Sequence, residues 1–121
     1  MKLDLRKLKL RKVNETLQSI DQKRNNKSYT ILNPEGNHAI CAGLTDDIDV
    51  TVKGHVGYYC GGMNQNANIT VEGNVGTGVA ENMMSGKIHV KGNASQSAGA
   101  TAHGGFLAVS YTHLTLPTST H

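Results

Sequence analysis

The chain has 121 residues and a mass of 12.9 kDa, which leaves room for one domain, because two cores of half that length would each bury too little surface. Aromatic residues make up only 4%, with no Trp and a single Phe, which excludes a large aromatic core. No run approaches the roughly 18 apolar residues that would span a bilayer, and the N-terminus lacks the apolar stretch of a signal peptide. We therefore expect a cytoplasmic protein.

The net charge of +3 is unevenly distributed along the chain. Residues 1–27 contain nine Lys or Arg against three acidic residues, a net charge of +6, whereas the remainder contains three Lys against six acids, a net charge of −3. A basic arm of this kind is a solvated helix face, or it binds nucleic acid or an acidic partner protein. The arm has no aromatic residue on which a base would stack, which disfavours nucleic acid.

The first element is a short amphipathic helix. Apolar residues at Leu10, Val13, Leu17 and Ile20 follow the spacing of one helix face. A polar, non-periodic stretch at 21–27 then indicates a linker that leads into a short strand at 29–32. We treat residues 1–28 as an N-terminal arm.

An internal repeat follows and is the most informative feature of the sequence. The segments 50–57, 69–76 and 88–95 align without gaps, each with a strand-like apolar-x-apolar-charged-Gly pattern. Their glycines, at 54, 73 and 92, recur with a period of 19, and we expect each to adopt a positive φ at a corner. The unit is too short to include a helix and lacks the Leu pattern of leucine-rich repeats. It predicts an all-β fold, a parallel β-helix over 29–109.

Stacked turns of a β-helix bring equivalent side chains into ladders about 4.8 Å apart. One inward ladder is predicted from Val52, Val71, Val90 and Val109, and a second from Val50, Ile69, Ile88 and Leu107. Second strands are predicted to run through 58–60, 78–80 and 97–99, where small residues would let the backbone bend tightly or another surface come close. Upstream, the separation between Gly36 and its expected counterpart Gly54 is shorter than one full period, so the register of the first turn is less certain. The glycines assigned a structural role are Gly54, Gly73, Gly76, Gly78, Gly86 and Gly92.

The repeat ends after Val109. Residues 110–121 contain no glycine and no repeat, and they form a non-native-looking tail that is foreign to the solenoid by pattern. A β-helix that ends there would leave its last strand as an unpaired edge, and such edges recruit other chains. The tail has no alternating apolar face, and Pro117 cannot donate to a ladder, so we expect it to leave this edge uncovered.

No group of residues predicts catalysis or metal binding. The Gly-rich segment 73–78 is followed by another strand repeat rather than by a helix, which favours structural corners over a phosphate-binding loop. His38, His55, His89 and His103 are scattered over different repeat positions, a weak signal for a metal. Cys41 and Cys60 are separated by one period of the repeat, hence by one turn if the register holds, and in a reducing compartment they are interpreted as buried apolar residues rather than a disulfide.

Two loops of adjacent turns combine Tyr, Met and amide side chains, which suit a protein interface better than bare solvent. The alternative is that the methionines close the core of the solenoid itself. The predicted partner-interface residues are Tyr58, Tyr59, Met63, Asn64, Gln65, Glu81, Asn82, Met83 and Met84.

The strings GYYCGGMNQ at 57–65, GTGVAENMMSG at 76–86 and QSAGAT at 96–101 resemble the GXGXG β-helix domain of the glutamate synthase family. The resemblance is strongest to the stand-alone β-helix subunit of N-methylglutamate synthase, also called methylamine-glutamate N-methyltransferase. It covers roughly residues 3–109 and implies a right-handed β-helix. Further turns that the family would have are missing after residue 109, so the chain looks like a truncated fragment.

The resemblance implies a non-catalytic scaffold subunit of an oxidoreductase or transferase complex in glutamate metabolism. Such a subunit joins a class II glutamine amidotransferase-like subunit to a synthase subunit, and the cofactors, FMN and an iron–sulfur cluster, belong to the synthase. An alternative is the β-helix subunit of formylmethanofuran dehydrogenase, which has the same GXGXG repeat, although the string at 57–65 argues against it. A third hypothesis, a nucleic-acid-binding module, rests on the basic arm alone.

Overall fold

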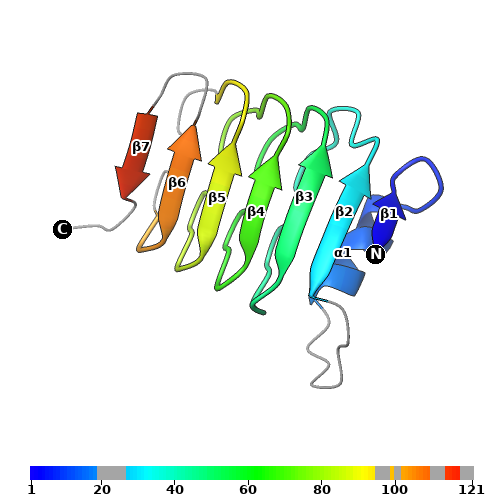
Figure 1. Cartoon of the computed structure of the whole chain (residues 1–121), viewed down its shortest axis with the longest axis horizontal. Coiled ribbons are helices and arrows are strands. Elements are labelled where there is room, and N and C mark those ends of the chain that lie inside the picture. The colour runs from blue at the N-terminus through cyan, green and yellow to red at the C-terminus, as the bar shows by residue number, and fades with distance from the viewer. Residues whose placement is uncertain (19–26, 95–98, 100–101, 110–113, 118–121) are drawn as a thin grey trace.

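The chain is a parallel β-helix with a short helix near its N-terminal end (Figure 1). A computed structural model describes residues 1–18, 27–94, 99, 102–109 and 114–117. The described residues form a seven-stranded sheet in sequence order, parallel from β1 to β6, with β7 antiparallel to β6. Its elements are β1 (Lys2–Asp4), α1 (Leu10–Gln18), β2 (Ser28–Leu32), β3 (Asp49–Lys53), β4 (Asn68–Val71), β5 (Lys87–Val90), β6 (Phe106–Val109) and β7 (Leu114–Pro117).

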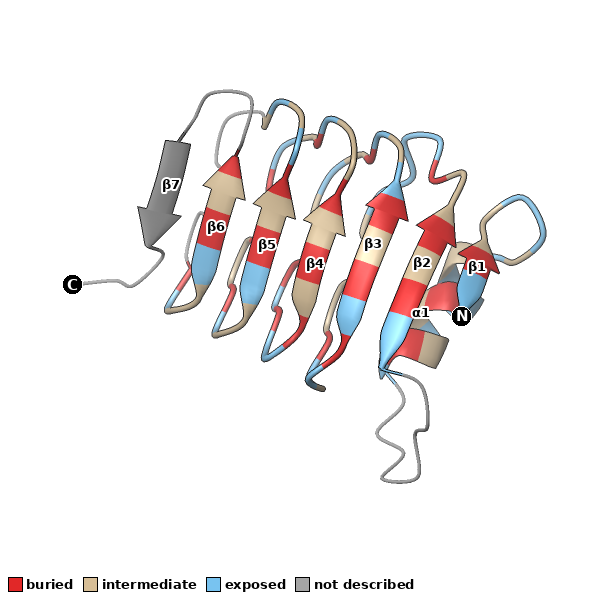
Figure 2. Cartoon of the chain, in the orientation of Figure 1, coloured by how far each residue is buried: buried red, intermediate tan, exposed pale blue. Residues whose placement is uncertain are grey.

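The two predicted ladders are confirmed. Val71 lies opposite Val52 and Val90 in neighbouring strands, and all three side chains have no exposed surface. The second ladder, Val50, Ile69, Ile88 and Leu107, is in register and buried as well. From β2 to β6, buried residues therefore alternate along the strand with half-buried or exposed ones (Figure 2). From β3 to β6 the paired residues keep the constant period that the glycines predict.

The first turn is longer than predicted. Tyr29 of β2 pairs with Val50 of β3, which makes this turn longer than the later ones, whereas the position of Gly36 predicts a shorter one. On the other side of the solenoid, the N–H of Gly61 donates to the carbonyl of Ile40, which places Gly61 opposite Cys41. Cys60 is therefore opposite Ile40. Cys41 and Cys60 lie on adjacent turns but are offset by one position, so the prediction that they occupy equivalent positions is wrong.

The corner glycines serve a different purpose from the predicted one. Only Gly54 has a positive φ, at 139°, while Gly73 and Gly92 do not. A Cβ atom on Gly73 would lie 2.4 Å from the carbonyl oxygen of Gly54, and one on Gly92 would lie 2.5 Å from that of Gly73. Glycine is needed at these two corners because successive turns approach each other too closely for any side chain.

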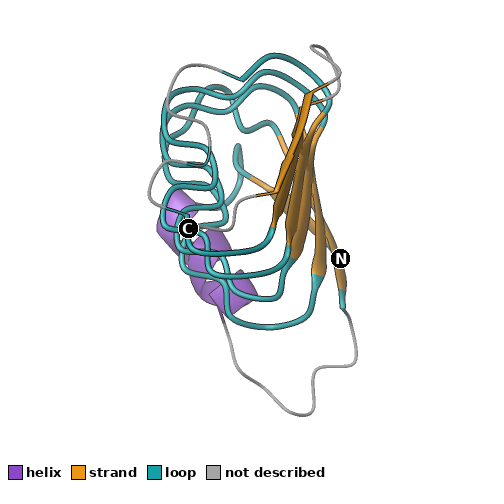
Figure 3. Cartoon of the chain, turned by 90° about the vertical axis from the view of Figure 1, so that its left-hand side faces the viewer, coloured by secondary structure: helices purple, strands orange, loops and turns teal. Residues whose placement is uncertain are grey.

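The predicted second strands are wrong. Residues 58–60 and 78–80 form turns, and of 97–99 only Gly99 lies within the described residues. These segments still bond from turn to turn: the N–H of Tyr59 donates to Thr77 O, and that of Ala80 donates to Cys60 O. Stacked loops therefore face the sheet across the core (Figure 3). We call residues 38–44, 58–65 and 77–84 the loop wall.

The N-terminal arm is part of the solenoid. Sequence reasoning missed β1, which adds a parallel strand to the sheet and buries Leu3 in the common core. The predicted helix is present as α1, with Val13 and Leu17 fully buried, while Ile20 lies outside the described residues. No helix in the described part of the chain is long and apolar enough to cross a membrane.

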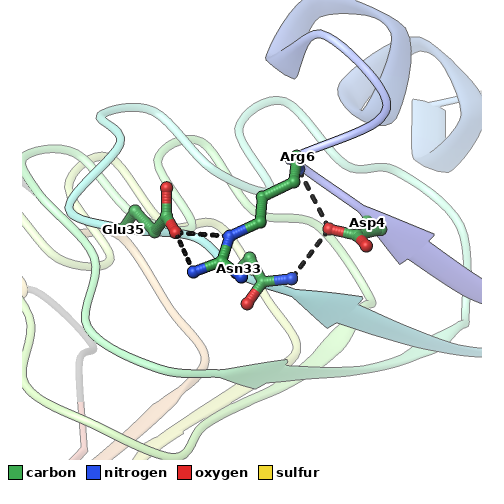
Figure 4. A network of polar contacts seen from close by, with 4 residues as sticks. All are labelled: Asp4, Arg6, Asn33 and Glu35. Atoms are coloured by element: carbon green, nitrogen blue, oxygen red, sulfur yellow. Dashed lines mark hydrogen bonds and ion pairs between the residues drawn. The ribbon is translucent and has the colours of Figure 1, made fainter.

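A polar network fastens β1 to the turn after β2 (Figure 4). The Asp4 carboxylate accepts hydrogen bonds from the Asn33 side-chain amide at 2.8 Å and from the Arg6 N–H at 2.9 Å. The Arg6 guanidinium in turn pairs with Glu35 at 2.6 Å. The amide of Asn33 and then the N–H of Arg6 lower the pKa of Asp4 below its ordinary value.

We expect this network to weaken in acid. Because the pKa of Asp4 is lower in the folded chain than in the unfolded one, its contribution is fully present above the unfolded value near 3.8 and is lost as the pH falls through the folded value. The effect is small, because the residue is partly exposed and solvent screens the carboxylate. Melting of the natural chain and of Asp4→Asn should differ by a constant amount at neutral pH, and the two curves should approach each other below the unfolded pKa and converge below the folded one. A difference that persists unchanged into strong acid would contradict this.

The predicted uncovered edge at the C-terminal end is wrong for β6. β7 pairs antiparallel with it, with Leu116 opposite Leu107 and Pro117 opposite Phe106. Pro117 is the last paired residue of β7, so its missing N–H does not break the pairing of any residue beyond it. The remainder of the predicted tail, 110–113 and 118–121, lies outside the described residues.

Candidate functional site

The loop wall has an unusual backbone. Three residues in each of its turns, at alternating positions, have φ between 56° and 82°. Six of the nine are not glycine, and each such residue costs about 1 kcal/mol relative to ordinary backbone conformations. The surrounding stack compensates for this cost. The nine residues, one turn after another, are Ala39, Cys41 and Gly43; Tyr59, Gly61 and Met63; Gly78, Ala80 and Asn82.

The loop wall presents large side chains to solvent. Tyr58 is 60% exposed, and Met63 and Met84 are each 48% exposed. Of the other residues predicted for the interface, Gln65 is exposed, and Tyr59, Glu81 and Asn82 are half-buried. Exposed Tyr and Met on a rigid, hydrogen-bonded backbone suit a protein-binding surface, because little conformational entropy is lost when a partner docks.

Two predicted interface residues are not on the surface. Met83 has no exposed surface and belongs to the core, so the alternative that a methionine closes the solenoid holds for this residue. Asn64 is also fully buried, and its side-chain amide donates to Ala67 O at 2.9 Å while its Oδ1 has no partner within the described residues. The interface prediction is therefore wrong for these two side chains and remains a prediction for the other seven.

Tyr58 is held in place by His38. The two rings stack with centroids 4.5 Å apart, and Nδ1 of His38 accepts the Tyr58 N–H at 2.8 Å. The imidazole also lies over Gly57, where a Cβ atom would come within 2.1 Å of Nδ1. Gly57 therefore leaves the room that this ring needs, and the exposed tyrosine ring has a fixed position at the edge of the wall.

His55 has a structural role at a neighbouring corner. Its Nδ1 accepts the N–H of Asn74 at 2.8 Å, and Oδ1 of Asn74 accepts the N–H of Asn93, also at 2.8 Å. His55 and Asn74 are one repeat apart, and each accepts a hydrogen bond from the backbone N–H of the next turn. They can do so alike because His Nδ1 and Asn Oδ1 are the same number of bonds from the backbone. The Nδ1 atoms of His38 and His55 thus both act as acceptors for backbone groups.

This equivalence can be tested by substitution. His55→Ala should lower the free energy of unfolding by about 1 kcal/mol, because the N–H of Asn74 loses its acceptor. His55→Asn should lower it by much less, because the new side chain reproduces the contact that Asn74 already makes. Chemical denaturation of the three proteins measures both values. Equal losses in the two variants would show that the imidazole contributes something other than this hydrogen bond.

The remaining features of the sequence do not form a site. No group of three or more His, Cys, Asp or Glu among the described residues is arranged to hold a metal ion. In the Gly-rich segment, the N–H groups of Val75 and Gly76 donate to carbonyls of neighbouring turns instead of facing an anion. In the basic arm, Arg6 pairs with Glu35 and Arg11 with Glu15, so part of its charge is neutralised locally.

Comparison with known proteins gives one partial relative. The chain is 50% identical over 57 residues to protein GlxC of Rhizobium meliloti (strain 1021), a match that covers 47% of this chain. It spans only a quarter of GlxC, 25% of that protein's length. No protein-family model matches the chain, and no solved structure matches it significantly.

Proposed function

We propose that this chain is a non-catalytic β-helix scaffold subunit of a glutamate-synthase-like complex, of the N-methylglutamate synthase type. In this role it joins a glutamine amidotransferase-like subunit to a synthase subunit that holds FMN and an iron–sulfur cluster. The chain contributes the docking surface, and the partners contribute the chemistry.

The observation that carries this proposal is the loop wall. Two of the strings that resemble the glutamate synthase family, 57–65 and 76–86, fall almost entirely on it. The same strings supply the exposed Tyr58, Met63 and Met84. A stretch that served only to fold the solenoid would turn its large apolar side chains inward, as the strand ladders do. The match to GlxC further supports the link to the glutamate synthase family.

The proposal is tested by changing the wall without changing the fold. Tyr58→Ser combined with Met84→Ser removes two exposed side chains and should leave the melting temperature nearly unchanged. The variant should lose about tenfold or more in affinity for the proposed amidotransferase-like or FMN-dependent partner, because exposed aromatic residues and methionines contribute strongly to interface energies. Titration calorimetry with each purified partner gives the affinities.

A matched control lies on the opposite side of the solenoid. Phe106 belongs to the sheet and is 42% exposed, so Phe106→Ser removes an apolar side chain of similar exposure away from the wall. This variant should bind both partners as the natural chain does. If the wall variant binds normally, or the control loses as much affinity, the wall is not the docking surface.

A further inference from the structure

Among the described residues no loop layer of the wall precedes 38–44, yet the backbone of this segment is not left open. In the later turns, N–H groups point back and donate to the preceding turn, as Gly61 does to Ile40 O and Ala80 does to Cys60 O. The equivalent group in the first turn is the N–H of Cys41. It donates to Oδ1 of Asn14, on α1, at 2.9 Å.

The amides of α1 also take up two carbonyls of the same edge. Nδ2 of Asn14 donates to Ala39 O at 2.8 Å, and Nε2 of Gln18 donates to Ala42 O at 2.7 Å. In the next turn, the carbonyl that corresponds to Ala42, that of Gly62, accepts the N–H of Gly43. Asn14 and Gln18, one helical turn apart, therefore supply the donors and the acceptor that a preceding turn would have supplied.

Apolar contacts complete this arrangement. Val13 and Leu17 have no exposed surface and pack into the common core, which includes Ile40 and Leu44 of the first turn. The helix thus covers both the polar rim of the loop wall and the apolar end of the stack. Side chains of one short helix therefore pair with backbone groups that, in the later turns, pair with the preceding turn.

We propose that α1 is an edge cap that prevents a second copy of this chain from pairing with the first turn of the loop wall. Without the helix, the N–H of Cys41 and the carbonyl of Ala42 would be unpaired at this edge. The corresponding groups of the next turn, on Gly61 and Gly62, pair with backbone of a neighbouring turn, so the same geometry can bind another stretch of backbone. A second copy offers an identical edge with the same unpaired groups, so association through the two edges satisfies both.

The test removes the amides that fasten α1 to the loop wall, so that the helix leaves the edge more readily. Asn14→Ala with Gln18→Ala raises helix propensity while it deletes the three hydrogen bonds to the wall. We expect the dissociation constant for self-association to fall by about tenfold or more relative to the natural chain, measured by sedimentation velocity over a range of concentrations. Amide exchange should show Cys41 exposed in the diluted variant and protected again in the associated one.

The control changes the other face of the same helix. Arg11→Ala with Glu15→Ala deletes the exposed ion pair and should leave association unchanged. Gln18→Ala alone, at an exposed position, provides a folded comparison if the double variant is too unstable, and it should associate to an intermediate degree. Folded capping variants that associate no more than the natural chain, or a control that associates as strongly, would overturn the proposal.

Discussion

Val71→Asp should leave the chain unfolded under conditions in which the natural protein is folded. Val71 lies between Val52 and Val90 with no exposed surface, and no donor in the ladder can reach a carboxylate placed there. Burial of an unpaired charge costs several kcal/mol or more, on the order of the whole stability of a small domain, about 5–15 kcal/mol. Circular dichroism and a thermal melt measure the loss.

The adjacent residue is the control for this experiment. Thr70 is on the same strand, but its side chain points away from the core, opposite Thr51 and His89 on the outer face. Thr70→Asp introduces the same charge at the neighbouring position and should melt within a few degrees of the natural chain. A folded Val71→Asp protein, or two variants of equal stability, would mean that the register of the core is wrong.

The second large effect concerns the two cysteines. Both are free and fully buried, and burial raises the pKa of Cys60 to about 12. Burial, and then the neighbouring Cys60, raise the pKa of Cys41 well above its usual value. Since the thiolate is the reactive form, alkylation by iodoacetamide near neutral pH should be slower in the folded chain by about a hundredfold or more than in denaturant.

Mass spectrometry of samples quenched over time gives the two rates residue by residue. Because the folded pKa values are raised, the rates should stay low as the pH rises to about 9, where an ordinary thiol is largely ionised. A rate within tenfold of the denatured one for either residue would show that it reaches solvent. Such a result would also reopen the interpretation of these residues as apolar parts of the core.

The strands and their register could be predicted because they repeat. Apolar residues at alternating positions and glycines at a fixed spacing identify β3, β4, β5 and β6, and with them both ladders. Where the repeat is interrupted, so is the prediction: the first turn is longer, and β1 is very short, with a single buried side chain. Short, unrepeated elements have too little pattern to be recognised.

The site was harder to predict, for two physical reasons. Left-handed backbone at Cys41, Tyr59 and Ala80 is imposed by the stack, and residues of these types normally avoid it, so no composition signal precedes it. The contacts of Asn14 join a helix to backbone that is distant in the sequence. No spacing pattern in a sequence predicts that a side chain will make the hydrogen bonds that a preceding turn would otherwise make. The sequence could not predict that Met83 and Asn64 are buried while their neighbours are exposed, because the loops follow neither helix nor strand periodicity.

Whether this chain holds the two proposed partners together can be measured directly. The chain would be co-expressed with an amidotransferase-like protein and an FMN-dependent synthase of the proposed type from the same organism, and the mixture analysed by size-exclusion chromatography with light scattering. We expect a single species that contains all three proteins, and two separate peaks when this chain is omitted. A complex that forms equally well without the chain, or a chain that elutes alone at its own mass of 12.9 kDa, would contradict this expectation.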